Sequence, residues 1–133
     1  MNLDAYIAVS GEGDLFKLIT SKTSGLVLEN LDSGKSRFYS VRKHQFTPLG
    51  TVAVYILGGT RQLNEIFQVM QDQKLTNPPV SHKAEKHEIE EYIESVIPDY
   101  DEDRVPLKDM KKLIKWFAFL DSRGMLAHKD EEE

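Results

Sequence analysis

A change of composition near residue 60 constrains the fold more than any other feature of the sequence. Residues 1–60 are rich in Gly, Ser, Thr, Val, Tyr and Phe, which are typical of strands and turns, whereas residues 61–133 are rich in Glu, Lys, Ile and Leu, which are typical of helices. Six Lys and Arg against five Asp and Glu give the first part a net charge of +1, and eleven against seventeen give the second part −6. The sequence therefore predicts an α+β protein whose strands come first.

The first part contains four predicted strands. Each is a short apolar run that ends at turn residues, and they span 14–20, 26–31, 36–41 and 51–56. Between the second and the third, Gly34 allows the positive φ of a tight hairpin. Four or five short strands joined by tight turns are typical of a small, curved sheet, so we expect an SH3-like or Tudor-like antiparallel β-barrel over residues 1–60.

The second part is predicted to be helical. We expect a connecting helix and a Pro-containing linker over residues 61–80, and a C-terminal helical hairpin over 81–126 with Glu on one solvated face and Lys on the other. Thr60 is a candidate cap for the first helix. The acidic tail, 127–133, has nothing to bury and is expected to be disordered. The connecting helix places its apolar residues on one stripe: Leu63, Ile66, Phe67 and Met70.

Several classes of protein are excluded by composition. The chain has no cysteine, which excludes thiol nucleophiles, thiolate zinc sites, iron–sulfur clusters and disulfide-stapled scaffolds. Its longest apolar run, 52–57, is far shorter than the ~20 residues that span a bilayer. Residues 1–4 lack the basic start and apolar stretch of a signal peptide. We therefore expect a cytoplasmic protein without membrane contact.

Two short motifs resemble metal sites but fail at essential positions. Residues 99–103 open like a calcium-binding EF-hand loop, yet Arg104 replaces the Gly of the turn and Met110 replaces the bidentate Glu. His87-Glu88 begins like the zinc motif H-E-x-x-H, but Glu91 replaces the second imidazole. We expect no metal and no cofactor, and we expect the acidic residues of 99–103 to cap the third helix.

No catalytic motif is recognisable in the sequence. It lacks a phosphate-binding glycine loop and a nucleophile elbow, and the carboxylates of the second helix alternate with lysines in the pattern of a solvated face. We therefore expect the protein not to be an enzyme.

Two groups of residues are candidate binding surfaces. The first is a nucleic-acid rim in which basic residues alternate with aromatic ones, and its cations are Lys35, Arg37, Arg42 and Lys43. The bland alternative is that the rings fill the barrel and the cations are solvated, and the net charge of −5 opposes binding to a polyanion. The second group is Trp116 and Phe119, which fall outside the main apolar stripe of the third helix. They are either sandwiched by neighbours or form a protein-interaction patch.

Three stretches carry a resemblance to a known family. They are residues 1–4 with 10–18, Ser81-His82-Lys83, and Pro98 to Val105 before the lysine-rich helix that contains Trp116. Together they resemble a family of uncharacterised bacterial proteins, classed as domains of unknown function, with an N-terminal Tudor-like or SH3-like barrel and a helical C-terminal part. The resemblance supports this architecture and implies no activity or site.

These observations lead to one functional expectation and one alternative. We expect a non-enzymatic cytoplasmic interaction module that binds a protein partner or a second copy of itself. The alternative is binding of RNA through the basic and aromatic rim of the barrel.

Overall fold

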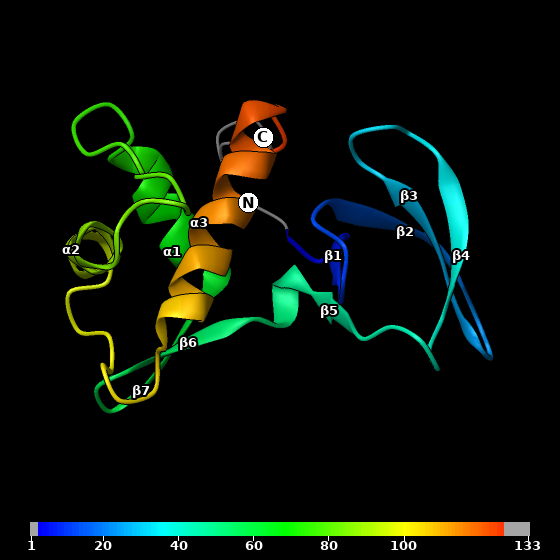
Figure 1. Ribbon diagram of the computed structural model, residues 1–133, viewed down its shortest axis with the longest axis horizontal. Coiled ribbons are helices and arrows are strands. Elements are labelled where there is room, and N and C mark those ends of the chain that lie inside the picture. Colours follow the sequence, from blue (N-terminus) through cyan, green and yellow to red (C-terminus); the bar gives the residue numbers. More distant parts are fainter. Residues whose placement is uncertain (1–2, 127–133) are drawn as a thin grey trace, which may run out of the picture. The chain divides into compact units, whose positions relative to one another are not determined.

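The computed structural model describes residues 3–126, which form two compact units, 3–52 and 53–126. We call them the sheet unit and the helical unit and describe each by itself (Figure 1). A five-stranded antiparallel sheet, a two-stranded sheet and three α-helices confirm the predicted α+β class. The predicted tail, 127–133, lies outside the described residues. In the helices that the structure describes, no stretch is both long and apolar enough to cross a membrane.

The sheet unit is an antiparallel meander with the strand order β4-β3-β2-β1-β5. Its strands are β1 (Tyr6–Val9), β2 (Leu15–Lys22), β3 (Gly25–Asn30), β4 (Ser36–Ser40) and β5 (Phe46–Pro48), and a 3-10 turn, η1 (Leu49–Thr51), follows. Within residues 3–126, β4 and β5 are the edges of this sheet and do not pair with each other. The closed barrel is therefore not confirmed. Pro48 has no backbone N–H to donate to a further strand, which suits β5 to an edge.

One face of the five-stranded sheet holds the core of the sheet unit. The core consists of Ile7, Val9, Phe16, Leu28 and Tyr39, and the Phe16 and Tyr39 rings meet edge to face at 5.3 Å. Ile7 and Val9 alternate with more exposed residues along β1, as a half-buried strand requires. Between Leu18 and Thr20 the pairing of β2 with β3 shifts by a bulge. Such a bulge bends a strand, and beyond it β2 is exposed.

The boundary between the units differs from the prediction. β6 (Ala53–Ile56) was expected to be the fourth strand of the barrel, but it pairs with β7 (Gly59–Gln62) as a hairpin of the helical unit. Its two-residue turn is Leu57-Gly58, and Gly58 has the positive φ of 86° that such a turn favours. Thr60 lies in β7 and caps no helix, since α1 begins at Leu63 with Gln62 as its N-cap. The units divide after Val52, not after residue 60.

Three helices supply the core of the helical unit. They are α1 (Leu63–Asp72), α2 (Lys86–Val96) and α3 (Leu107–Ser122). The predicted stripe of α1 is buried throughout, and the Phe67 ring meets the Phe117 ring of α3 edge to face at 5.5 Å. α2 packs on both α1 and α3. The linker after α1 is held to α2 by the Asn77 side-chain amide, which donates to Ser95 Oγ at 2.8 Å.

Candidate interaction surfaces

The four cations of the predicted rim lie along one edge strand. Lys35 is in the turn before β4, Arg37 is in β4, and Arg42 and Lys43 follow it; all four are exposed. The Arg37 guanidinium lies 4.6 Å from the centre of the Tyr39 ring. No ion pair joins any of the four to an acidic side chain of the described chain. The structure therefore brings these residues together on the β3–β4 edge.

The aromatic residues of the rim divide between core and solvent. Tyr39 is buried, and Phe46 packs partly against the core. Phe38 is 42% exposed, on β4 between Arg37 and Tyr39. Of these three rings, Phe38 is the one open to a base or another ring. The bland alternative, that Phe38 and Phe46 fill the core, therefore holds in part for Phe46 and is wrong for Phe38.

Trp116 and Phe119 are partly exposed and lie one turn apart on α3. The guanidinium of Arg123, one turn further on, stacks 3.7 Å above the Phe119 ring and donates to the Phe119 carbonyl at 3.1 Å. We call these three residues the α3 aromatic stripe. The buried stripe of the same helix is a different set: Met110, Leu113, Ile114, Phe117 and Leu120. The predicted patch is therefore not part of that buried set.

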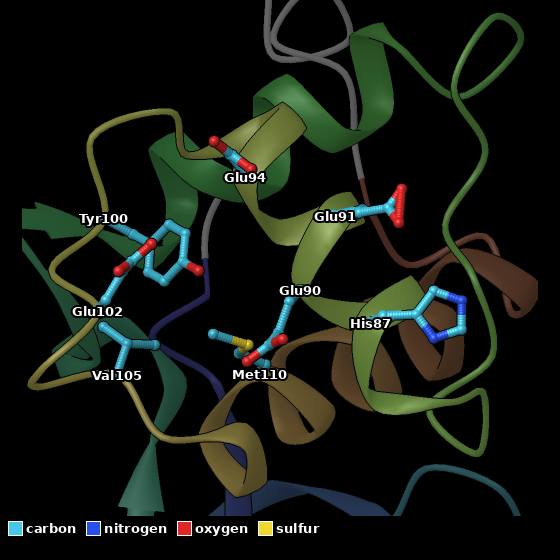
Figure 2. A pocket seen from close by; sticks show the side chains of 8 residues that line it. All are labelled: His87, Glu90, Glu91, Glu94, Tyr100, Glu102, Val105 and Met110. Carbon is cyan, nitrogen blue, oxygen red and sulfur yellow. The ribbon is translucent and has the colours of Figure 1, made fainter.

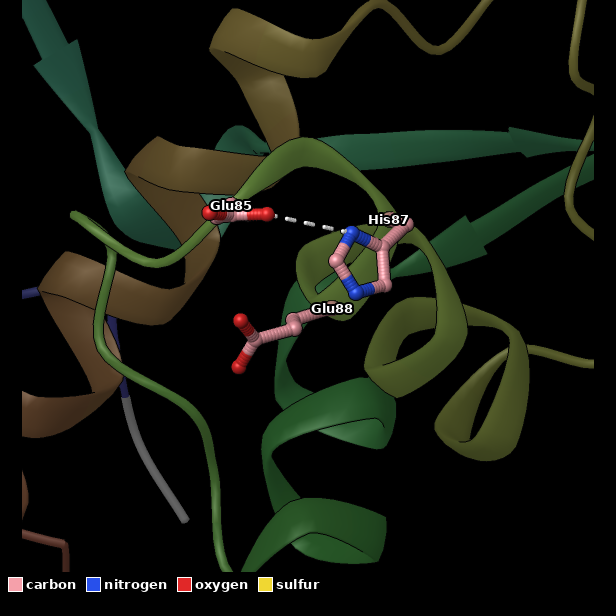
Figure 3. A group of neighbouring side chains, drawn as sticks. All are labelled: Glu85, His87 and Glu88. Atoms are coloured by element: carbon pink, nitrogen blue, oxygen red, sulfur yellow. Dashed lines mark ion pairs between the residues drawn. The ribbon is translucent and has the colours of Figure 1, made fainter.

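The start of α2 gathers three possible metal ligands. One ligand atom each of Glu85, His87 and Glu88 lies within 4.8 Å of the others, and Nδ1 of His87 is 3.6 Å from a Glu85 carboxylate oxygen (Figure 3). All three side chains are exposed. A catalytic zinc site takes three protein ligands in a pre-organised shell, and an exposed helix start holds none of these side chains in place. The expectation that zinc does not bind stays a prediction.

The sequence analysis missed a pocket of about 410 Å³ in the helical unit. Its walls come from α2, from the loop after α2 and from α3 (Figure 2). The lining residues are His87, Glu90, Glu91, Glu94, Tyr100, Glu102, Val105 and Met110. A volume of this size lies within the ordinary range for ligand sites, about 300–1,000 Å³. We call this cavity the α2 pocket.

Helical spacing explains one wall of the α2 pocket. Glu90, Glu91 and Glu94 follow His87 by three, four and seven residues, so all four side chains share one face of α2. Val105 and Met110, which are both buried, also line the pocket. The sequence analysis assigned these carboxylates to a solvated face. Their spacing was a usable signal, but only the fold places an aromatic loop residue beside them.

The loop that carries Tyr100 and Glu102 is held to the β6–β7 hairpin. The Asp101 amide donates to the Tyr55 carbonyl at 3.0 Å, and the Leu57 amide donates to the Asp99 carbonyl at 2.9 Å. The two terminal nitrogens of the Arg61 guanidinium donate to the Asp99 carboxylate, at 2.7 and 3.0 Å. These contacts hold the backbone of the loop that forms one wall of the pocket to a β-hairpin.

The same contacts correct the predicted role of the acidic loop. α3 begins after Pro106, and no side chain caps it. Asp99 instead binds Arg61, and this hydrogen-bonded pair lowers the pKa of Asp99 and raises the pKa of Arg61. Asp101 accepts a hydrogen bond from the Asp103 amide within the loop. Asp99 therefore pairs with Arg61, 38 residues away along the chain, and not with the start of α3, because a helix dipole acts only over the first turn.

Negative charge dominates the α2 pocket. Four of its eight lining residues are Glu, and none of the eight is Lys or Arg. Burial raises the pKa of Tyr100, and Glu102, Glu90 and Glu94 raise it further. These three carboxylates therefore act together at the tyrosine. A ligand that suits this pocket carries positive charge.

Family comparisons divide the chain where the structure does. Residues 52–120 match the family described as "Domain of unknown function (DUF6852)". The chain belongs to this family. Residues 3–49 match a second one, "Domain of unknown function (DUF5606)". The predicted membership of a family of unknown function is confirmed, whereas its Tudor-like or SH3-like barrel is not.

One solved structure is similar over most of the chain. It is a solution NMR structure of a structural genomics target from Bacteroides vulgatus, with 28% sequence identity and a TM-score of 0.75. The similarity covers 93% of this chain and 89% of that chain. No curated protein matches the sequence. The comparisons thus show a similarity to a bacterial protein that covers both units, and they assign no activity.

Proposed function

We propose that this protein is a non-enzymatic cytoplasmic interaction module that binds a protein partner, or a second copy of itself, through the α3 aromatic stripe. The observation that supports it most directly is the partial exposure of Trp116 and Phe119 beside a stacked arginine. Trp, aromatic residues and Arg are the types enriched at the energetic centres of protein interfaces. The proposal takes the sheet unit as an open SH3-like or Tudor-like sheet, which its five short strands in meander order support.

Replacing Trp116 by Ala tests this proposal. We expect Trp116→Ala to weaken binding at least about tenfold, because truncating a central aromatic removes well-packed interface area. Self-association is measured by analytical ultracentrifugation, and partner binding by quantitative cross-linking of the tagged protein in bacterial lysate. Leu57→Ala is the matched control, since Leu57 is an apolar side chain of the same unit that is 69% exposed and lies in the turn of the β6–β7 hairpin.

The two variants distinguish a role of Trp116 at an interface from a role in the core. The proposal holds if Trp116→Ala loses self-association or the cross-linked partner while its circular dichroism stays that of the wild type, and Leu57→Ala keeps both. The proposal is wrong if Trp116→Ala binds like the wild type, or if its sole effect is a lower melting temperature. In the second case Trp116 is a core residue.

The alternative function, RNA binding by the sheet unit, is favoured by one observation of its own. The exposed Phe38 ring lies on β4 among cations that have no acidic partner in the described part of the chain. Cations that follow phosphates and a ring that stacks on a base are the elements of single-strand binding. If this alternative holds, Arg37→Glu with Arg42→Glu and Lys43→Glu abolishes binding to an RNA pool, and wild-type affinity falls steeply with added salt. Absence of any wild-type shift at low salt removes it.

A further inference from the structure

We infer that the α2 pocket binds an ammonium group on an aliphatic chain, as presented by the lysines of a basic peptide. This site is separate from the α3 aromatic stripe and does not depend on the proposed function. The cavity itself carries the inference, because it combines apolar, aromatic and anionic walls around one space of about 410 Å³. A lysine side chain has the matching parts, an apolar stem and a charged head.

The two sides of the cavity offer different contacts. Figure 2 shows Tyr100, Glu102 and Val105 on one side and the α2 glutamates, Glu90 and Glu94, on the other. The Tyr100 ring and, to a small extent, the nearly fully buried Val105 and Met110 offer apolar contact to a methylene stem. The Tyr100 ring offers a π face and the carboxylates offer acceptors to an ammonium head. A cation entering between them is therefore contacted on both sides.

The pocket carboxylates suit a polyvalent organic cation better than a metal ion. Calcium binding needs six to eight oxygen ligands at about 2.3–2.6 Å from one ion, so the ligands must converge. In residues 3–126, the one cluster with ligand atoms within 4.8 Å of one another is Glu85, His87 and Glu88, and Glu90, Glu94 and Glu102 are not part of it. Carboxylates spread around a cavity are the arrangement that spaced ammonium groups neutralise.

Charge balance points the same way. Surface carboxylates on helices commonly pair with a Lys or Arg three or four residues away, and such pairs are weak. Among the described residues, Glu90, Glu91, Glu94 and Glu102 form no such ion pair. Within residues 3–126 no Lys or Arg neutralises these carboxylates at ion-pair distance, so a bound cation gains their joint attraction. That attraction is screened by salt.

The experiment measures binding of a tetralysine peptide to the full-length protein by ¹H–¹⁵N NMR titration. A tetrapeptide of acetylated lysines, similar in size but without side-chain charge, is the matched ligand control, and spermidine tests whether a free polyamine is the better source of the ammonium groups. We expect tetralysine to shift the amide signals of Tyr100, Glu102 and Val105. We expect the acetylated peptide to shift none of them.

Two double variants test the location. Glu90→Gln with Glu94→Gln removes two charges from the pocket, and Glu85→Gln with Glu88→Gln removes two charges from the start of the same helix, outside the lining. Both replacements keep side-chain size on exposed or half-buried positions, so the fold is retained. We expect the pocket variant to lose about tenfold in affinity, equal to the ~1.4 kcal/mol of a tenfold change, and the control variant to lose less than about threefold, because exposed charges outside the lining act on the ligand through screening solvent.

Each outcome decides the inference. Equal losses in the two double variants, or equal binding of the acetylated peptide, overturn it, because binding is then nonspecific. Absence of any shift with tetralysine and spermidine at low salt also overturns it. If spermidine shifts these amide signals and tetralysine does not, the pocket is still an ammonium-binding site, but a basic peptide is not the source of the ammonium group. Trp116→Ala leaves tetralysine binding unchanged, so failure here is distinguishable from failure of the α3 aromatic stripe.

Discussion

In the sheet unit, four large apolar side chains remain 41–55% exposed: Leu18, Ile19, Phe38 and Val41. In the helical unit, the exposed large apolar residues are Tyr55, Leu57 and Leu75, and none of them lies on α1, α2 or α3. A helix turns its apolar stripe toward one neighbour, whereas a single sheet has two faces and only one of them covers the core. The comparison explains the exposure of Phe38, which pairs with Val27 on the face away from the core, whereas Leu18 lies on the core face but in the exposed part of β2.

The largest expected effect comes from truncating each core. Phe16 and Phe117 are fully buried, one in each unit, so Phe16→Ala and Phe117→Ala should each cost about 3–5 kcal/mol of unfolding free energy. Hydrogen exchange with mass spectrometry reads each unit separately, and each variant should lose protection in its own unit. Equal loss in both units for either variant would break the comparison, because the units would then unfold as one. Leu75→Ala, at 95% exposure, should stay within about 0.5 kcal/mol.

A close backbone contact in the sheet unit predicts the next effect. A Cβ on Gly25 would meet the Tyr39 carbonyl and would lie 2.8 Å from the Phe38 ring. Gly25→Ala should therefore cost about 1–3 kcal/mol, as overpacking does. Gly59→Ala in β7 is the control, since a Cβ there meets nothing within 4 Å. Chemical denaturation measures both, and equal costs for the two variants would show that strand glycine itself, and not the contact, matters.

A buried hydroxyl in the helical unit predicts a gain in stability. The Tyr92 hydroxyl is buried without a hydrogen-bond partner in the described structure, and burial raises its pKa to about 12. Tyr92→Phe should raise the unfolding free energy by about 1 kcal/mol at neutral pH. Because the folded-state pKa is raised, the wild type loses stability as the pH rises above the ordinary value of 10.0, and the variant, in which only Tyr100 keeps a raised pKa of this kind among the described residues, loses less. Melting temperatures from neutral to alkaline pH measure this; a parallel decline in both proteins contradicts it.

The smallest expected effect is the pH dependence of the Arg61–Asp99 pair. Its hydrogen bonds lower the pKa of Asp99, so its stabilisation is complete above the ordinary carboxyl pKa and disappears as the pH falls through the lowered one. Asp99→Asn should therefore lower the melting temperature slightly at neutral pH and not at strongly acidic pH. Asp103→Asn is the control, because Asp103 is an exposed carboxylate in the same loop. If the lower melting temperature of Asp99→Asn persisted at strongly acidic pH, its cause would be a changed loop structure and not the loss of the Asp99 charge.

Local patterns predicted much of this molecule. The stripe of Leu63, Ile66, Phe67 and Met70 is buried as its spacing indicated, since helical periodicity depends on neighbours three and four residues apart. Gly34 has the positive φ of 76° that its hairpin requires. The rim cations came together on β4 because they were already close along the chain. The finer prediction, a closed barrel, depended on edge pairing that no local pattern encodes.

The sequence by itself determined the α+β class, the faces of the helices and the tight turns, because each depends on spacing or on one residue's allowed backbone angles. Only the tertiary structure decided that the β6–β7 hairpin belongs to the helical unit, that Asp99 binds Arg61, and that Tyr100 stands opposite the glutamates of α2. No local pattern in the sequence around β6 or Asp99 indicates what either of them contacts in the fold. Contacts across long chain separations depend on the free energy of the whole packed unit, and several pairings satisfy the same local pattern.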